Sequence, residues 1–232
     1  MPLHLGDTAE LAIFDICIWI RQTKREIFIL QTSARLYFLL CMAEVFEDDL
    51  RAACEVLGKG GIILYPTDTI WGIGCDATDD DAVRRVFDIK RRADGKALIV
   101  MVDSPVKIDF YVDAPPPVAF DLVEVSEKPL TIVYPRGRNL SPLLLAEDGS
   151  VGIRVTSESF SQALCRRYRK AIVSTSANIS GEKAPVNYNG ISDEIKAAVD
   201  YIVAYRQDDV SEPSASSVIK VDDGGVIKIL RP

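Results

Sequence analysis

From Met42 onward, short apolar runs alternate with amphipathic stretches, and this alternation limits the chain to folds in which helices cover a sheet. We expect helices at residues 47–57, 79–90 (capped by Thr78), 159–168 and 191–199. We expect strands at residues 62–65, 97–102, 130–134, 151–155, 171–174, 201–204, 217–221 and 226–230. We expect the last two to form a hairpin, which argues against an all-parallel sheet. The pattern predicts an α/β fold with one domain over residues 42–232, built on an open, twisted, mixed sheet with flanking helices.

Residues 1–41 differ in pattern from the rest of the chain. Two apolar runs, Leu11–Ile20 and Ile27–Leu40, are separated by charged residues, and neither reaches the roughly 20 residues that a membrane span needs. The first ten residues carry two acidic residues and no Lys or Arg, unlike a secretory signal. We interpret residues 1–41 as an atypical N-terminal extension: either an added helical or strand element, or a stretch upstream of a true start at Met42.

The composition of the chain argues against several kinds of binding site and catalytic mechanism. The formal net charge of −7 argues against a generally basic nucleic-acid-binding surface, so any RNA contact must be local. The five cysteines are widely spaced without a C-x-x-C pair, which favours neither a zinc site nor a disulfide framework and fits a reducing cytoplasm. His4 is the only histidine, so histidine-based metal sites and Ser-His catalysis are excluded from the central chain.

The first segment that indicates chemistry is Tyr65-Pro66-Thr67-Asp68-Thr69-Ile70-Trp71-Gly72-Ile73-Gly74. A buried strand stops there at a proline and gives way to hydroxyls, a carboxylate and glycines. Loops at strand ends are where open α/β sheets place ligands. A plain turn with a packed Trp71 is the alternative, and the two glycines do not make a dinucleotide fingerprint, because no third glycine opens a helix.

Basic residues form the second segment, Lys90-Arg91-Arg92, with Lys96 close behind. Cations at the end of a predicted helix favour its dipole, which needs no ligand to explain it. Four cations within seven positions exceed that need, and a triphosphate is a small ligand that could use them. We therefore expect exposed cations that bind phosphate, with a solvated basic patch as the alternative.

The third segment, Ser174-Thr175-Ser176-Ala177-Asn178-Ile179-Ser180-Gly181, follows an apolar strand. Its hydroxyl and amide groups could donate several hydrogen bonds to an anion, although Asn/Ser turns are abundant. The chain has no G-x-x-x-x-G-K-[ST] loop, so a nucleotide here would be held differently than in P-loop enzymes.

These three segments, together with Gly152-Ile153-Arg154, Ser216-Ser217-Val218 and Ile229-Leu230-Arg231-Pro232, closely resemble the YrdC/TsaC family of threonylcarbamoyl-AMP synthases. The motifs occur in the family's order, and their joint match is far more specific than any one of them. The resemblance implies a YrdC-like domain with a concave basic ligand cavity.

The resemblance also implies a nucleotidyltransferase that makes threonylcarbamoyl-AMP and pyrophosphate from L-threonine, bicarbonate and ATP, the first step of a tRNA modification. A downstream threonylcarbamoyl-transferase complex would take the product. Magnesium would arrive with ATP, with no dedicated metal site and no tightly bound prosthetic group. We expect a cytoplasmic protein that can contact tRNA or double-stranded RNA and has no membrane partner.

Residue by residue, the resemblance assigns catalysis and ATP handling to a tetrad, Lys90, Arg92, Ser176 and Asn178. The implied L-threonine site consists of Thr67, Arg154, Ser174 and Ser216. Ser150 and Arg231 would complete the ATP site. These roles come from the family's motifs and not from composition or spacing.

The chain departs from the family pattern in three places. Met101 stands where many relatives have a histidine, Ala93 where a proline is common, and residues 125–129 replace an aromatic-Pro-Gly run. Two other functions remain open: a non-catalytic RNA-binding or ribosome-maturation protein of the same fold, and carbamoyl-adenylate chemistry like that of the YrdC-like domain of hydrogenase maturation proteins.

Overall fold

The computed structural model describes residues 42–91, 98–211 and 215–232. Residues 1–41, interpreted above as an extension, and Arg92 of the predicted tetrad lie outside the described residues. The chain divides into two compact units, Met1–Val45 and Phe46–Pro232, and the fold below is that of the second. Among the described residues, no helix is both long enough and apolar enough to span a membrane.

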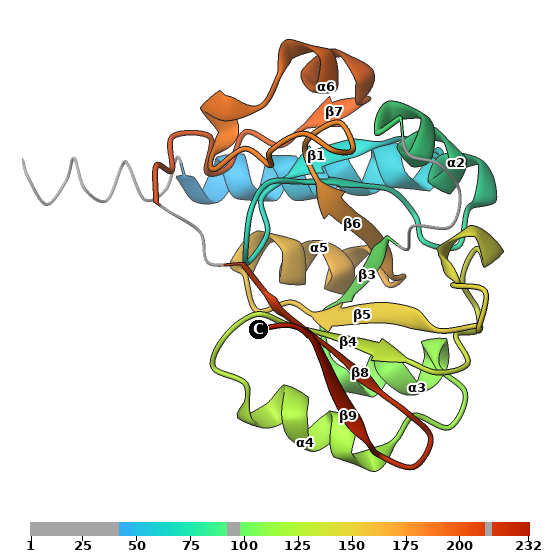
Figure 1. Cartoon of the computed structure of the whole chain (residues 1–232). Coiled ribbons are helices and arrows are strands. Elements are labelled where there is room, and N and C mark those ends of the chain that lie inside the picture. Colours follow the sequence, from blue (N-terminus) through green and yellow to red (C-terminus); the bar gives the residue numbers. More distant parts are fainter. Residues whose placement is uncertain (1–41, 92–97, 212–214) are drawn as a thin grey trace, which may run out of the picture. The chain divides into compact units, whose positions relative to one another are not determined.

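A mixed sheet forms the centre of the second unit (Figure 1). Within the described residues it has nine strands: β1 (Ile63–Tyr65), β2 (Gly72–Gly74), β3 (Ile99–Val102), β4 (Leu130–Tyr134), β5 (Val151–Val155), β6 (Ile172–Ser176), β7 (Tyr201–Ile202), β8 (Ser217–Val221) and β9 (Ile227–Arg231). Their order is β7-β1-β2-β6-β3-β5-β4-β8-β9. The pairs β1–β7, β3–β5 and β4–β8 are parallel and the others antiparallel, so the predicted mixed sheet is confirmed.

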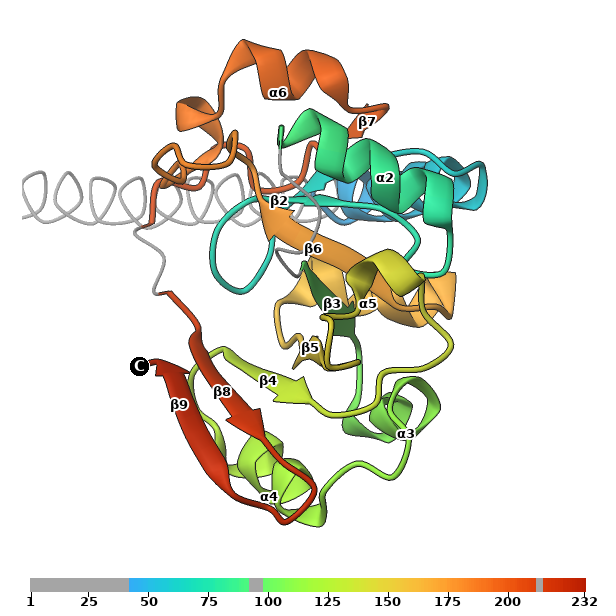
Figure 2. The same ribbon diagram turned by 45° about the vertical axis from the view of Figure 1, so that its right-hand side comes forward.

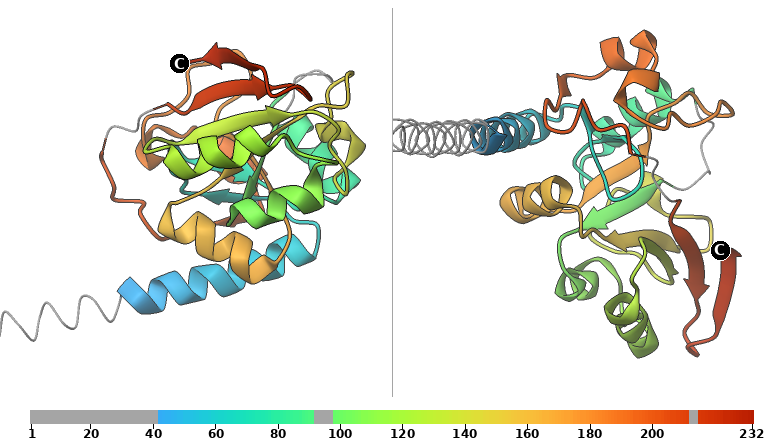
Figure 3. Two further views of the ribbon diagram at one scale, coloured as in Figure 1. Left: turned by 90° about the horizontal axis from the view of Figure 1, so that it is seen from below. Right: turned by 90° about the vertical axis from the view of Figure 1, so that its left-hand side faces the viewer.

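Helices cover the sheet. Within the second unit residues 46–58 are helical, and the chain continues with α2 (Asp80–Ile89), α3 (Ile108–Tyr111), α4 (Pro117–Val125), α5 (Ser159–Tyr168) and α6 (Asp193–Ala198). Helices α3, α4 and α5 lie on one side of the strands, and the β8–β9 hairpin curls toward the other (Figures 2 and 3). Three 3-10 turns complete the described elements: Pro105–Lys107, Pro142–Leu144 and Tyr188–Gly190.

Three local expectations were wrong, each for a physical reason. Asp79, not Thr78, caps α2, because the Asp79 carboxylate accepts from the backbone of Asp81 and Ala82. Thr78 instead donates its hydroxyl to Asp76. The strand predicted at residues 171–174 runs on to Ser176, because its last residues pair with β2 (Gly72–Gly74), a strand that the sequence pattern does not predict. Helix α4 was also missed: it begins with Pro117 at its first position, where proline suits a helix.

Candidate active site

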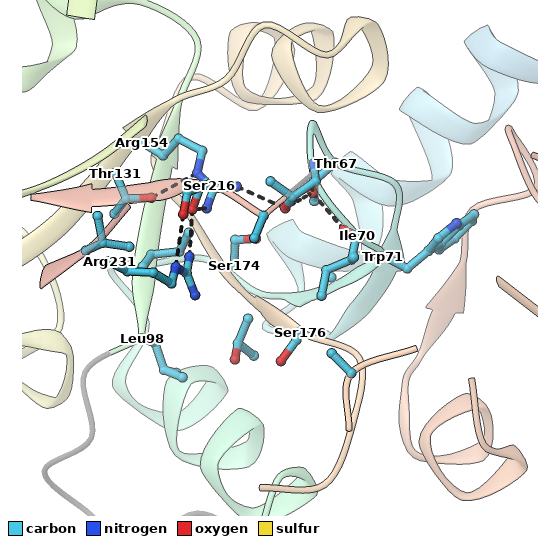
Figure 4. Close-up of a pocket in the computed structure, with 17 residues that line it drawn as sticks. Thr67, Ile70, Trp71, Leu98, Thr131, Arg154, Ser174, Ser176, Ser216 and Arg231 are labelled. Carbon is cyan, nitrogen blue, oxygen red and sulfur yellow. Dashed lines mark hydrogen bonds between the residues drawn. The ribbon is translucent and has the colours of Figure 1, made fainter. Parts of the chain in front are cut away.

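A cavity of about 450 Å³ opens on the sheet, and its wall includes most of the residues predicted for a site (Figure 4). Six of the ten candidates line it: Thr67, Arg154, Ser174, Ser176, Ser216 and Arg231. They come from segments spread over more than 160 positions of the sequence, and the strand pairing brings them together.

Strand register places one row of these side chains. Arg154 on β5 lies opposite Thr131 on β4, Thr131 lies opposite Val218 on β8, and Val218 lies opposite Arg231 on β9. Directly paired residues project from the same face of a sheet, so all four side chains reach the cavity. One wall of the site is therefore a cross-strand row with an arginine at each end.

A second row comes from β6. Ser174 lies opposite Ile99 on β3, and Ser176 lies opposite Gly72 on β2. Because Ser174 and Ser176 are two positions apart on one strand, their hydroxyls share the cavity face. A Cβ at Gly72 would lie 3.2 Å from the Ser174 hydroxyl oxygen, so this glycine keeps the floor of the cavity open.

The loop between β1 and β2 supplies Thr67. Its Oγ1 donates to the carbonyl oxygen of Ile70 at 2.7 Å and accepts from the backbone N–H of Thr69 at 3.1 Å. These bonds close a tight turn that fixes the hydroxyl at the cavity wall. The strand-end segment predicted to contribute to a ligand site thus supplies Thr67 and its neighbours to the cavity wall.

Arg154 is almost fully buried, and each of its three guanidinium nitrogens donates to a neighbouring side chain. Its Nε donates to Thr131 Oγ1 at 3.0 Å, and its Nη2 donates to Ser216 Oγ at 2.8 Å. Its Nη1 forms an ion pair with Asp68 at 2.9 Å. The guanidinium is thus held in one orientation before any ligand arrives.

Arg231 reaches the site because of a bulge in the terminal hairpin. Val218 pairs with Arg231, but the next residue, Ile219, pairs with Ile229, so β9 carries one extra residue, Leu230. Such a bulge re-aims side chains, and here it places the arginine on the cavity face. Arg231 then donates from Nε to the carbonyl oxygen of Ser216 at 2.9 Å and from Nη2 to its hydroxyl oxygen at 2.8 Å.

Lys90 differs from expectation. We predicted an exposed cation, but its side chain is buried and only 2% of the residue is exposed. Its Nζ donates to the carbonyl oxygens of Ser176 at 2.5 Å and Asn178 at 2.7 Å. Lys90 is the C-cap residue of α2 and does not line the cavity; it ties that helix to the end of β6.

Asn178, Ser150 and Met101 also lie away from the cavity wall. The Asn178 amide donates to the carbonyl oxygens of Ile179 and Glu182, which shapes the turn after β6. The Ser150 hydroxyl donates to Asp148 at 2.5 Å. The structure therefore does not bring the predicted ATP residues Asn178 and Ser150 to this cavity.

Met101, the residue in place of the family histidine, belongs to the core. It lies opposite Arg154 in the β3–β5 register but is fully buried. The Tyr65 hydroxyl donates to its sulfur at 3.4 Å and to the Val173 carbonyl oxygen at 3.3 Å. Burial raises the pKa of Tyr65 well above its usual range, so this hydroxyl stays protonated and remains a donor.

Sequence reasoning missed Asp68 and Thr131, which orient Arg154. In the sequence, Asp68 lies between Thr67 and Thr69, which both line the cavity. A carboxylate in a segment that follows a buried strand indicates that a buried cation pairs with it. Thr131 could not be found, because a lone threonine in a strand is ordinary.

Within the part of the chain that the structure describes, the cavity wall contains no Asp or Glu, and no group of three His, Cys, Asp or Glu could hold a metal ion. The charged side chains on the wall are Arg154 and Arg231. The arrangement can bind an anion through two guanidinium groups and several hydroxyls.

Comparison with known proteins gives consistent results. Residues 55–232 match the Sua5/YciO/YrdC family model, described as "Telomere recombination". A threonylcarbamoyl-AMP synthase from Pseudoalteromonas translucida is 31% identical over 160 residues, which are 68% of this chain and 86% of that protein.

Two solved structures share the fold. P. abyssi Sua5 complexed with L-threonine matches with a TM-score of 0.69 and 25% identity over 79% of this chain, which spans only 53% of the Sua5 chain. E. coli YciO matches with a TM-score of 0.68 and 26% identity, covering 78% of this chain and 87% of YciO.

Proposed function

The chain belongs to the Sua5/YciO/YrdC family, and from that premise we propose that it makes threonylcarbamoyl-AMP and pyrophosphate from L-threonine, bicarbonate and ATP. The product is an activated carbamoyl group of the kind needed to modify a tRNA adenosine. A downstream threonylcarbamoyl-transferase would consume it. Direct contact with tRNA or double-stranded RNA and a cytoplasmic location remain part of the proposal.

One observation carries this proposal: the four residues assigned to L-threonine, namely Thr67, Arg154, Ser174 and Ser216, line one cavity. Together they offer hydroxyls and a guanidinium, which suit the hydroxyl and carboxylate of that amino acid. A relative of the same fold has been solved with L-threonine bound.

The proposed chemistry needs no covalent enzyme intermediate. The threonine amine attacks carbon dioxide and loses a proton, or attacks bicarbonate with loss of water, and either route gives a carbamate. A carbamate oxygen then attacks the α-phosphorus of ATP and expels pyrophosphate. The protein's part is to position the reactants and to stabilise negative charge. Arg154 and Arg231, at the two ends of the cross-strand row, are suited to that part.

Magnesium enters this scheme as part of the substrate, Mg–ATP. Among the described residues of the cavity wall there is no carboxylate that would form a cage for the ion. Mg²⁺ tends to keep several waters and to be bound through substrate phosphates, so the triphosphate itself can hold it.

Lys90 and Asn178 lie away from the cavity wall, so these two residues of the predicted tetrad would act differently from Ser176, which lines it. In the structure Lys90 holds the carbonyl oxygens of Ser176 and Asn178. We therefore assign Lys90 to positioning of the loop after β6 in the ligand-free protein, and a phosphate contact by Lys90 would require those bonds to be exchanged.

The test is pyrophosphate release by the purified protein with Mg–ATP and bicarbonate, comparing L-threonine with L-serine, carbamoyl phosphate and no added substrate. Release that requires both L-threonine and bicarbonate is expected. Release with carbamoyl phosphate instead would indicate the hydrogenase-maturation type of chemistry. No release, with salt-sensitive RNA binding, would indicate the non-catalytic alternative.

A further inference from the structure

The hydrogen-bond donors of Arg154 are nearly all in use before a ligand binds. A guanidinium carries five N–H groups. Nε donates to Thr131 Oγ1, Nη1 donates to both Asp68 Oδ1 (2.9 Å) and Thr69 Oγ1 (3.2 Å), and Nη2 donates to Ser216 Oγ. Among the described residues, only the second hydrogen of Nη2 has no acceptor. Arg154 therefore cannot present a two-nitrogen fork to an incoming carboxylate.

In the Ser216 hydroxyl, by contrast, it is the acceptor sites that are occupied. A hydroxyl oxygen has two acceptor lone pairs and one donor hydrogen. Arg154 Nη2 and Arg231 Nη2 each donate to Ser216 Oγ at 2.8 Å, which occupies both lone pairs. Its hydrogen must then point away from both arginines. Two positive charges beside the oxygen make that hydrogen a good donor to an anion.

Asp68 forms an ion pair with the Nη1 side of the Arg154 guanidinium. The ion pair is buried, with 6% of the Arg154 side chain and 5% of the Asp68 side chain exposed. Asp68 Oδ2 is also buried and has no hydrogen-bond partner among the described residues. The carboxylate is thus under-satisfied, and its main compensation is the charge of Arg154.

We propose that Asp68 is the resident counter-ion of Arg154 and limits how a substrate carboxylate is received. The carboxylate is held by one Nη2–H of Arg154 and by the adjacent Ser216 hydroxyl, one oxygen each. Asp68 neutralises Arg154 and lowers the affinity of the cavity for carboxylates, because the incoming anion must share a cation that already has a counter-ion. This inference rests on the proposed binding of L-threonine and makes Asp68 a positioning and specificity-determining residue.

The first test is Asp68→Asn, which keeps an acceptor oxygen but removes the charge. Titration calorimetry with L-threonine and with L-threonine methyl ester compares ligands that differ in the carboxylate charge. We expect the Kd for L-threonine to fall by about threefold to tenfold, while the Kd for the ester stays unchanged. A merely structural role would weaken both ligands together and would not tighten either.

Asp48→Asn is the matched control, because Asp48 pairs with Arg51 at 2.7 Å on the solvent-exposed surface. It should leave both Kd values at the wild-type level. A folded Asp68→Asn protein with an unchanged or raised Kd for L-threonine would overturn the proposal.

Ser216→Ala keeps the inference testable if Asp68→Asn does not fold. It removes one oxygen and with it the second half of the carboxylate site. We expect at least about tenfold weaker binding of L-threonine and a smaller loss for the ester. Equal losses for both ligands, or none, would refute the shared site. Failure of the wild-type protein to bind L-threonine would overturn the proposed function itself, whereas normal wild-type binding with unresponsive variants would overturn only this inference.

Discussion

The ammonium group of Lys90 donates to the carbonyl oxygen of Ser176, 86 positions away in the sequence, at 2.5 Å. A second donation, to the Asn178 carbonyl oxygen at 2.7 Å, makes Lys90 a clamp on the end of β6. The clamp lies directly behind a cavity serine, so Lys90 joins the basic motif to the backbone of the Ser-x-Asn motif.

Lys90→Met is therefore expected to affect stability as well as activity. Methionine keeps most of the buried volume but removes the Lys90 donor from the Asn178 carbonyl oxygen and one of two donors from the Ser176 carbonyl oxygen, which also accepts from the Asn178 backbone N–H. This loss costs about 1–3 kcal/mol. Urea unfolding should show a lower midpoint, and pyrophosphate release should fall more than about tenfold as Ser176 loses its position. Lys59→Met, at an exposed lysine, is the control. Unchanged stability with lost turnover would instead favour a direct role of Lys90 on phosphate.

Arg92→Ala is expected to lower turnover by more than about tenfold, as the family's tetrad implies. Arg92 lies outside the described residues, so this expectation comes from the sequence alone. Pyrophosphate release with circular dichroism as a folding check measures it. Full activity of a folded Arg92→Ala protein would remove Arg92 from the site.

The two glycines of β2 should respond differently to alanine. A Cβ at Gly74 would lie 2.6 Å from the Val173 carbonyl oxygen and 2.7 Å from the Tyr65 ring, so backbone must shift. We expect Gly74→Ala to destabilise the fold by about 1–3 kcal/mol. At Gly72 the nearest atoms are 3.2–3.4 Å away and belong to the cavity floor. Gly72→Ala should weaken L-threonine binding with a much smaller stability loss, and the reverse ranking in calorimetry and urea unfolding would contradict this assignment.

The alternation of apolar runs was enough to predict the mixed sheet, and helix α5 was predicted at its observed bounds, because strong local periodicity fixed both. Strand β2 was missed because Gly72-Ile73-Gly74 has low strand propensity, and only its pairing with β1 and β6 makes it a strand. The burial of Lys90 was missed for a related reason: a buried lysine needs acceptors, and these come from a turn that is distant in sequence. Local sequence does not report such partners.

Stability should fall in acid because of Asp76. Burial alone would raise the pKa of this carboxyl, but hydrogen bonds from Lys170, Tyr168 and Thr78 outweigh it and leave the pKa below its ordinary value. A carboxyl with a lowered folded-state pKa stabilises the protein above its unfolded pKa of about 4 and loses that contribution as pH falls toward the folded value.

Asp76→Asn should therefore flatten the dependence of the unfolding free energy on pH below about pH 4, and should itself lower stability at pH 7. Urea unfolding at a series of pH values measures both effects. Asp88→Asn, at an exposed position, is the control. An acid slope as steep in Asp76→Asn as in the wild type would place the acid sensitivity in another group.

Ser176 and Asn178, which the family resemblance places together in the tetrad, should show different effects when mutated. The Ser176 side chain lines the cavity, whereas the Asn178 amide donates to the carbonyl oxygens of Ile179 at 2.9 Å and Glu182 at 2.8 Å. Ser176→Ala removes a hydroxyl from the cavity wall and no turn bond, so turnover should fall about tenfold or more with an unchanged urea midpoint. Asn178→Ala breaks the turn after β6, so it should lower the free energy of unfolding by about 1–2 kcal/mol and the urea midpoint with it. Asn178→Asp, which keeps the shape but loses the amide donors, should lower the midpoint like alanine. If Asn178→Ala instead lowers turnover at an unchanged midpoint, its side chain acts on the reactants, and the turn must rearrange when ATP binds.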